Sequence, residues 1–177
     1  DPRCVVDFAH TPEAVAAALA ALRPTTPGRL IAVLGAGGDR DAGKRMAMGA
    51  AAARHADLVV ITDDNPRSED PAAIRAAVAA GVRSVAPDRC GDSGSGRAAD
   101  IATAIRLARA EPQPQEVTVV VLGKGHERGQ EIAGVVHPFD DRAAIVAALH
   151  GTAYRPTTTT SGAPGSSPAT DVAGAPS

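Results

Sequence analysis

The chain has 177 residues, which is enough for one domain with a hydrophobic core of its own. Its 18 Lys and Arg residues nearly balance its 20 Asp and Glu residues; the net charge of −2 and the lack of any block of like charges argue against a nucleic-acid-binding surface. Aromatic residues make up only 2% of the chain, which excludes aromatic stacking platforms for bases or sugars and leaves Ala, Val, Ile and Leu to fill the core.

Short apolar runs rich in β-branched residues alternate with Ala-rich stretches along the chain. The apolar runs predict strands at residues 3–8, 30–34, 58–62 and 117–122, with a further short edge strand at 131–136. The Ala-rich stretches predict helices at 11–22, 44–55, 71–80, 98–110 and 140–149. We expect Thr11 and Asp140 to cap the first and the last helix, and Gly81 to end the third.

This alternation predicts an α/β fold, a Rossmann-like open sheet that is mostly parallel and has helices on both faces. We expect the domain to occupy residues 1–151. Residues 88–96 (DRCGDSGSG) predict a Gly/Ser-rich surface insertion between a strand and a helix. Residues 152–177 contain mainly Thr, Ser, Gly, Ala and Pro, so we expect them to form a disordered tail that contributes nothing to folding.

Other features bear on the origin and compartment of the chain. It begins at Asp1 without Met and enters an apolar strand almost at once, so we interpret it as a fragment of a longer protein. No apolar run approaches the ~20 residues that span a bilayer, and the N-terminus lacks a signal-peptide pattern. Cys4 and Cys90 form neither a disulfide framework nor a metal-ligand spacing, so we interpret them as incidental thiols in a reducing cytoplasm.

Nearly every polar residue with chemical character lies just after a predicted strand. These residues fall into four loops, at 7–12, 35–41, 63–67 and 123–127. The carboxyl ends of parallel strands lie at one edge of a sheet, and ligands bind in the crevice beyond them. We therefore expect the four loops to form one site.

Two of these loops are rich in glycine but match no nucleotide-binding motif. The segment GAGGDR at 35–40 has Arg40 where the GxGxxG fingerprint needs its third glycine. Neither this segment nor GKG at 123–125 continues into the Gly-Lys-Ser/Thr of a Walker loop. Taken alone, the first segment could also be only a flexible strand-to-helix turn. A complete nucleotide-binding domain is therefore disfavoured.

The loop at 63–67 and its neighbours carry side chains suited to a zwitterion. Pro66 stiffens the loop and pushes Asn65 into an extended conformation, and Arg67 offers a planar fork for a carboxylate. Arg40 adds a second fork, and Glu127 adds an anion for an ammonium group. This set suits an amino acid with more than one charged end, although residues 64–67 alone could also be an N-cap cluster with a surface arginine.

His10 and His126 both lie in these loops. Neither has a Ser or Cys partner beside it, so the sequence predicts no nucleophilic catalyst. No His, Cys and carboxylate spacing predicts a zinc site, and we expect no metal ligand within the chain.

Four motifs occur together in the order and spacing of a known family. They are VDFAHTP at 6–12, GGDRD at 37–41 followed by GKR at 43–45, TDDNPR at 62–67, and GKGHE at 123–127. On these motifs, residues 3–150 resemble the C-terminal domain of the Mur ligases. DNPR at 64–67 resembles the recognition motif of the members that add diaminopimelate, whereas members that add lysine carry a different sequence there.

The resemblance implies an ATP-dependent ligase that forms an amide bond in cytoplasmic peptidoglycan synthesis, and thus in cell-wall biogenesis. In that family the D-Glu carboxylate of UDP-MurNAc-L-Ala-D-Glu is activated as an acyl phosphate, and the amine of diaminopimelate then attacks it. ATP and Mg²⁺ are bound mainly by a central domain that, like the N-terminal domain, lies outside this sequence. We therefore expect the chain alone to be inactive, and to be a monomer without nucleic-acid or membrane partners.

The resemblance also implies roles for individual residues. Arg40 and Arg67 would hold carboxylates of diaminopimelate, and the Gly123 carbonyl with Glu127 would hold its distal ammonium. The other residues expected at the diaminopimelate site are Asp64, Asn65 and Pro66, and those expected near ATP are Asp7 and His10. No catalytic residue is expected within the chain itself.

Two departures from the family pattern leave the motifs intact. Phe8 stands where the family usually has Tyr, and the insertion from Cys90 to Ser95 lengthens a loop that the family keeps shorter. Two other functions stay open: a module that binds an amino acid without catalysis, and another Mur-like ligase such as a folylpolyglutamate synthetase. The second is weakened by DNPR, because folate enzymes need no clamp for a distal zwitterion. The residues do not distinguish meso- from LL-diaminopimelate.

Overall fold

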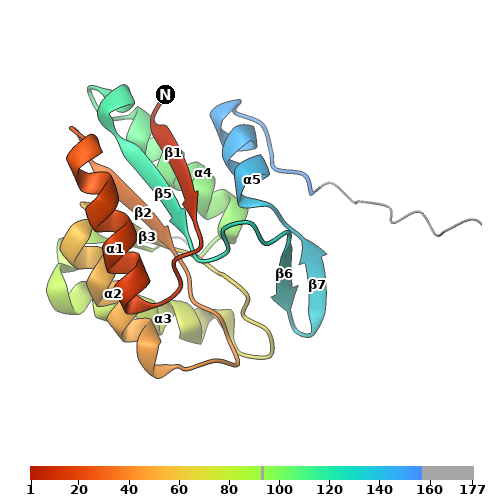
Figure 1. Cartoon of the computed structure of the whole chain (residues 1–177). Helices are drawn as coiled ribbons and strands as arrows, with labels where there is room; N and C mark the ends of the chain where they lie inside the picture. The colour runs from red at the N-terminus through yellow and green to blue at the C-terminus, as the bar shows by residue number, and fades with distance from the viewer. Residues whose placement is uncertain (93, 157–177) are drawn as a thin grey trace, which may run out of the picture.

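The computed structural model describes residues 1–92 and 94–156 and has the expected α/β fold (Figure 1). One parallel sheet has the strand order β1-β5-β2-β3-β4, with β1 Arg3–Asp7, β2 Leu30–Leu34, β3 Leu58–Ile61, β4 Cys90–Asp92 and β5 Thr118–Leu122. A separate hairpin pairs β6 (Gly129–Ile132) with β7 (Val135–Pro138). The helices are α1 Pro12–Leu22, α2 Gly43–His55, α3 Pro71–Val85, α4 Arg97–Arg109 and α5 Asp141–Leu149, and short 3₁₀ turns lie at Arg23–Thr25, Pro87–Arg89 and Pro114–Glu116. No helix in the described part of the chain has the length and apolar character needed to span a bilayer.

Alternate residues of the central strands face two hydrophobic clusters, one on each side of the sheet. Leu30, Ala32 and Leu34 of β2 belong to the cluster formed with α1, α2 and α3. Ile31 and Val33 belong to the cluster formed with α4 and α5. Figure 1 shows this division of the helices between the two faces. A strand covered on both faces needs apolar side chains at every position, which is why β2 is a continuous apolar run.

The predicted caps of the first and last helices are confirmed. The Thr11 side chain accepts a hydrogen bond from the Ala14 amide at 3.2 Å. The Asp140 side chain accepts hydrogen bonds from the amides of Arg142 and Ala143 at 2.8 and 3.2 Å. Because these caps satisfy amides that the first turn leaves without partners, they determine where α1 and α5 begin.

The prediction that Gly81 ends the third helix is wrong, because α3 continues to Val85. A Cβ atom at Gly81 would lie 1.9 Å from the Met46 carbonyl oxygen of α2. A Cβ atom at Gly49 of α2 would lie 2.0 Å from the Val78 carbonyl oxygen of α3. These two glycines therefore permit close packing of α2 on α3 rather than ending a helix.

The composition of residues 88–96 predicts a surface insertion, but part of this segment belongs to the sheet. Cys90–Asp92 forms β4, which pairs in parallel with residues 59–61 of β3 at the edge of the sheet. A three-residue edge strand is held mainly by backbone hydrogen bonds, so it carries no apolar pattern that a sequence could reveal. Residue 93 lies outside the described residues.

The strand expected at 131–136 is instead part of the hairpin β6–β7, which does not join the main sheet. Its turn residues Ala133 and Gly134 both have positive φ, at 50° and 76°, as two-residue hairpin turns commonly do. The Arg67 amide donates to the Glu131 carbonyl at 3.0 Å, and the Ala133 amide donates to the Arg67 carbonyl at 2.7 Å. The hairpin is therefore joined to the candidate loop at 63–67.

The domain boundary expected at Gly151 leaves out an ordered residue, Tyr154. The Tyr154 ring lies 5.0 Å from the Phe139 ring, centroid to centroid, and its hydroxyl oxygen accepts a hydrogen bond from the Asp140 amide at 3.0 Å. Tyr154 thus packs against one of the two core clusters. The remainder of the expected tail, residues 157–177, lies outside the described residues.

A fully buried ion pair determines where two of the candidate loops begin. Arg97 of α4 donates to both carboxylate oxygens of Asp141 at 2.7 and 2.8 Å. The same guanidinium donates to the carbonyls of Asp63 and Leu122 at 3.2 and 3.0 Å. Because Leu122 ends β5 and Asp63 follows β3, Arg97 holds the carboxyl ends of both strands in place.

Candidate functional site

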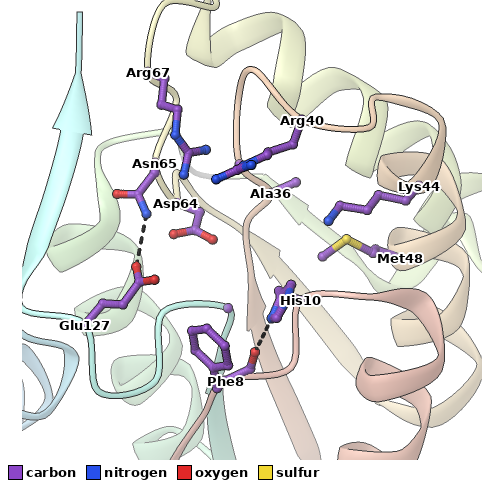
Figure 2. Close-up of a pocket in the computed structure, with 12 residues that line it drawn as sticks. Phe8, His10, Ala36, Arg40, Lys44, Met48, Asp64, Asn65, Arg67 and Glu127 are labelled. Atoms are coloured by element: carbon purple, nitrogen blue, oxygen red, sulfur yellow. Dashed lines mark hydrogen bonds between the residues drawn. The ribbon is translucent and has the colours of Figure 1, made fainter. Parts of the chain in front are cut away.

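An open cavity of about 340 Å³ lies at the carboxyl ends of β1, β2, β3 and β5 (Figure 2). The four loops predicted to converge all contribute to it, so their convergence is confirmed. The expected site residues that line the cavity are His10, Arg40, Asp64, Asn65, Arg67, Gly123 and Glu127. Phe8, Ala36 and Gly37 of the expected loops also line it, and Lys44 and Met48, which lie outside these loops, were not expected. Asp7 and Pro66 do not line the cavity.

The loops at 35–41 and 63–67 are joined at Gly38. Its amide donates to the Asn65 carbonyl at 2.8 Å, and a Cβ atom on Gly38 would lie 1.9 Å from the Pro66 carbonyl oxygen. The Arg67 Nη1 atom donates back to the Gly38 carbonyl at 2.7 Å, and Arg67 itself has a φ of +53°. Pro66 therefore shapes the wall of the cavity through its backbone, without facing the interior.

Two guanidinium groups occupy one side of the cavity. Figure 2 shows the side chains of Arg40 and Arg67 pointing toward each other there, with the Lys44 side chain nearby. Arg67 is held by the Gly38 carbonyl and by Glu131, whose Oε2 atom lies 3.4 Å from Arg67 Nε. Arg40 is exposed and forms no hydrogen bond or ion pair with another residue of the described ranges. This side of the cavity thus combines a fixed cation with an unpaired one.

Carboxylate groups and an amide occupy another side. Asn65 Nδ2 donates to Glu127 Oε2 at 3.1 Å, as the dashed line in Figure 2 marks. Lys124 contacts both of these residues and has a fully buried side chain. Its Nζ atom donates to Asn65 Oδ1 at 3.1 Å and to Glu127 Oε2 at 3.3 Å. The loops at 63–67 and 123–127 are therefore joined through a buried ammonium group.

Asp64 is the most deeply buried carboxylate of the cavity wall, and burial raises its pKa. The positive charges of Arg97 and Lys124 oppose this shift, and the negative charges of Glu127 and Asp141 add to it. Its Oδ1 atom is buried and accepts no hydrogen bond within the described residues. A carboxylate that is desolvated in this way favours a cationic group of a ligand.

The cavity therefore has two chemically different sides. Guanidinium groups suit carboxylates, since their planar forks can donate two parallel hydrogen bonds. Carboxylate oxygens and the Gly123 carbonyl suit an ammonium group, which has only donors. Together they suit a small molecule that carries both kinds of charge.

Residues 1–125 match the family described as "Mur ligase, glutamate ligase domain". The chain belongs to the Mur ligase family.

This Mur ligase domain is similar in sequence to parts of longer ligases. The UDP-N-acetylmuramoyl-L-alanyl-D-glutamate--2,6-diaminopimelate ligase of Caulobacter vibrioides is 55% identical over 149 residues, which cover 82% of this chain and 28% of that protein. The ligase of the same name from Streptomyces coelicolor is 55% identical over 150 residues, covering 84% and 29%. The chain thus spans less than a third of the length of these relatives.

Solved structures give the same relationship. A structure of a UDP-N-acetylmuramoyl-L-alanyl-D-glutamate--2,6-diaminopimelate ligase superposes with a TM-score of 0.75 at 40% identity, over 85% of this chain and 30% of that one. A folylpolyglutamate synthase of Mycobacterium tuberculosis superposes with a TM-score of 0.52 at 24% identity, over 86% and 30%. The second likeness extends to the fold alone.

Sequence reasoning missed some residues of the site in this Mur ligase domain. Lys44 and Met48 lie one turn apart on α2 and both line the cavity. Lys44 belongs to the GKR motif, and the i, i+4 spacing places Met48 on the same side of the helix, so these two could have been found. Lys124 was missed because GKG at 123–125 was considered only as a phosphate loop and excluded as one, whereas its side chain points into the protein.

The first loop of the Mur ligase domain carries aromatic rings to the rim of the cavity. The Phe8 ring lies between His10 and His126, at centroid distances of 4.7 and 5.5 Å. The His10 Nδ1 atom is hydrogen bonded to the Phe8 carbonyl oxygen at 2.8 Å. Asp7 turns away from the cavity and accepts the Ala9 amide at 2.8 Å, so its side chain shapes this loop.

A lysine and a glycine amide that could contact a phosphate group are both engaged with other residues of this Mur ligase domain. Lys124 is buried against Asn65 and Glu127, so it cannot reach a phosphate group as the lysine of a Walker loop does. The Gly38 amide is already donated to the Asn65 carbonyl. No group of three or more His, Cys, Asp or Glu side chains in the described ranges could hold a metal ion.

Proposed function

We propose that this chain is the amino-acid-binding domain of an ATP-dependent ligase that joins diaminopimelate to UDP-MurNAc-L-Ala-D-Glu. The observation that carries the proposal is the cavity with guanidinium groups on one side and carboxylates on the other. Diaminopimelate has two carboxylates and two amines, so it matches both sides. The names of the relatives that are 55% identical support this choice of substrate.

Arg40 and Arg67 bind the carboxylates of the incoming amino acid. Arg67 is held on a loop joined to the hairpin, and its Nη2 atom has no protein partner in the described ranges. It therefore suits the distal carboxylate, which lysine lacks. Arg40 is unpaired and exposed, so it can adjust to the second carboxylate. A charge-assisted contact of this kind contributes about 1.5–3 kcal/mol.

Glu127, Asp64, Asn65 and the Gly123 carbonyl bind the distal ammonium. Gly123 has a φ of +108°, and a Cβ atom there would lie 3.0 Å from Asp64 Oδ2. A side chain at position 123 would therefore press on the carboxylate that recognises the amine. This arrangement orients diaminopimelate so that its other amine points out of the cavity, toward the acyl group it attacks.

The remaining parts of the reaction belong to the rest of such a ligase. ATP supplies the energy by activating the D-Glu carboxylate, and we infer that domains outside this chain bind ATP, Mg²⁺ and the UDP-linked substrate. Asp7 and His10 are at the first loop and would lie near the nucleotide when those domains are present. On this proposal the chain alone is monomeric and inactive, and the intact ligase acts in the cytoplasm, where UDP-linked precursors are made.

The proposal is tested with a chimaeric ligase. Residues 1–156 of this chain replace the matching segment of the Streptomyces coelicolor relative, and amide-bond formation is measured with diaminopimelate, lysine and glutamate as acceptors. We expect turnover with diaminopimelate and little with the other two. Turnover with glutamate instead would favour a folylpolyglutamate-like ligase. Binding of diaminopimelate without turnover would favour a non-catalytic binding module.

Nucleotide binding by the chain alone provides an independent check. Isothermal titration calorimetry of the isolated chain with ATP and Mg²⁺ should show no tight binding, and the chain should hydrolyse no ATP. Tight binding would mean that the nucleotide site lies within these residues. The chimaeric ligase must bind ATP under the same conditions, so it serves as the positive control.

A further inference from the structure

Lys124 is a lysine without solvent contact beside a cavity that binds charged groups. Its side chain is fully buried, and it does not line the cavity. Its Nζ atom lies 3.1 Å from Asn65 Oδ1, 3.3 Å from Glu127 Oε2 and 3.8 Å from Asp64 Oδ1. A buried lysine is costly unless it is paired, so these three contacts account for its charged form.

Lys124 sets the net charge of the carboxylate side of the cavity. Asp64 and Glu127 contribute two negative charges, and Lys124 contributes one positive charge. The neighbouring Arg97 and Asp141 form an ion pair of their own and cancel each other. One negative charge is left, which is what a single ammonium group of a ligand neutralises.

Lys124 and the Glu131 amide together determine which way the Asn65 side-chain amide faces. Asn65 Oδ1 accepts from Lys124 Nζ at 3.1 Å and from the Glu131 amide at 3.0 Å. With its oxygen held by two donors, the amide must direct Nδ2 toward Glu127 Oε2, at 3.1 Å. Glu127 is thus held by two donors on the protein side, and its remaining oxygen is left for the cavity.

We propose that Lys124 is a positioning residue for amine recognition: it leaves the carboxylate side with one negative charge and fixes Asn65 and Glu127 in the orientation that receives the ammonium. This inference rests on the proposed function for the identity of the amine, but the contacts of Lys124 do not depend on any ligand. The side chain acts through Asp64, Asn65 and Glu127 and does not touch the substrate.

The test compares Lys124→Met with Arg128→Met. Both variants remove one positive charge, but the Arg128 side chain is 85% exposed and lies outside this contact network. The first measurement needs no ligand: the Asp64 carboxyl carbon is titrated by ¹³C NMR in the 177-residue chain, with its signal assigned from its loss in Asp64→Asn. The groups that face Asp64 are Arg97, Lys124, Glu127 and Asp141.

In Lys124→Met we expect the titration midpoint of Asp64 to rise by about one pH unit or more, because an opposite charge that favours its ionised form is gone. Arg128→Met should leave the midpoint in place. Equal midpoints in Lys124→Met and the unmodified chain would overturn the proposal.

The second measurement uses the chimaeric ligase. Lys124→Met should raise the KM for diaminopimelate by about tenfold or more while kcat changes less, because recognition is weakened and the reacting groups lie elsewhere. An unchanged KM would contradict the proposal. If the chimaeric ligase fails to use diaminopimelate at all while Asp64 still responds to Lys124→Met, then the proposed substrate is wrong and the role of Lys124 stands.

A double variant keeps the test valid if Lys124→Met is unstable. Lys124→Met with Glu127→Gln removes the lysine and one carboxylate together, so the single negative charge is restored. We expect its Tm to exceed that of Lys124→Met and its Asp64 midpoint to return toward the original value. A double variant with a lower Tm than the single variant would show that Lys124 does not act as the counter-ion.

Discussion

Arg45 and Glu69 form a bidentate ion pair behind the guanidinium side of the cavity. Arg45 Nη1 and Nη2 donate to the two oxygens of Glu69 at 2.8 and 2.7 Å. The Arg45 side chain is 5% exposed and also donates to the Gly37 carbonyl at 3.1 Å, while Glu69 accepts the Asp39 amide at 2.6 Å. The pair therefore connects α2, the loop at 35–41 and the segment that follows Arg67.

This pair predicts a pH-dependent contribution to stability. The hydrogen bonds from Arg45 lower the pKa of Glu69 from 4.5 to about 2. Because the pKa is depressed in the folded state, the stabilisation is fully present above pH 4.5 and is lost as the pH falls toward 2. We expect Glu69→Gln to lower the Tm at pH 7, and the difference from the unmodified chain to shrink between pH 4.5 and 2.

Asp88→Asn serves as the control, since Asp88 is exposed. Thermal melts of both variants across this pH range provide the measurement. A Tm difference for Glu69→Gln that is the same at pH 2.5 and pH 7 would contradict the assignment.

The close packing of α2 on α3 predicts that Gly81→Ala destabilises the protein. Alanine usually stabilises a helix relative to glycine by about 0.5–1 kcal/mol. Here the added Cβ atom would meet the backbone oxygen of Met46 at 1.9 Å, and such overpacking costs about 1–3 kcal/mol. We therefore expect a net loss, measured as a lower midpoint in urea. At Gly43 of α2 the nearest atom to a Cβ is a side-chain oxygen of Asp41 at 3.2 Å, so Gly43→Ala should be neutral or slightly stabilising.

The contacts of Tyr154 predict different results for two truncations. Ending the chain after Gly151 removes the ring that packs on Phe139 and the acceptor of the Asp140 amide, which should cost about 1–3 kcal/mol and lower the Tm by several degrees. Ending the chain after Pro156 keeps both contacts. From the composition of residues 157–177 we expect this second truncation to leave the Tm unchanged. Equal Tm values for the two truncated chains would mean that Tyr154 contributes nothing.

Arg67 predicts selectivity between diaminopimelate and lysine in the chimaeric ligase. Arg67→Ala should lower kcat/KM for diaminopimelate by a factor equivalent to about 2–4 kcal/mol of transition-state stabilisation, because it removes a charge-assisted contact to the distal carboxylate. The loss for lysine should be much smaller, since lysine has no carboxylate there. Arg67→Lys should restore little, because an ammonium cannot reproduce the planar fork.

The ion pair between Arg67 and Glu131 supplies the control for that experiment. Glu131→Gln removes the contact at 3.4 Å but leaves the Arg67 fork in place. We expect it to preserve the preference for diaminopimelate. If Arg67→Ala reduced kcat/KM equally for both amino acids, Arg67 would be a structural residue that only holds the loop against the Gly38 carbonyl.

The sequence by itself was enough to predict the alternation of strands and helices and the convergence of four loops. Apolar runs such as 30–34 and caps such as Thr11 and Asp140 are local signals, and parallel strands bring their carboxyl ends to one edge of the sheet in any fold of this kind. The residue types in those loops indicated charged groups of both signs, and these do meet in one cavity. Their individual contacts with a ligand remain predictions.

Only the tertiary structure decided which of these residues face the cavity and which support it. GKG at 123–125 lacks the Ser or Thr of a phosphate loop, but nothing in it reveals that Lys124 is buried beside Asp64 and Glu127, carboxylates from two separate loops. Gly81 suggested the end of a helix, but it lies inside α3 because the backbone of α2 leaves no room for a side chain. In both cases a deciding group, the Asp64 carboxylate or the Met46 carbonyl, belongs to a residue distant in sequence, and local patterns carry no information about what lies across a packed interface.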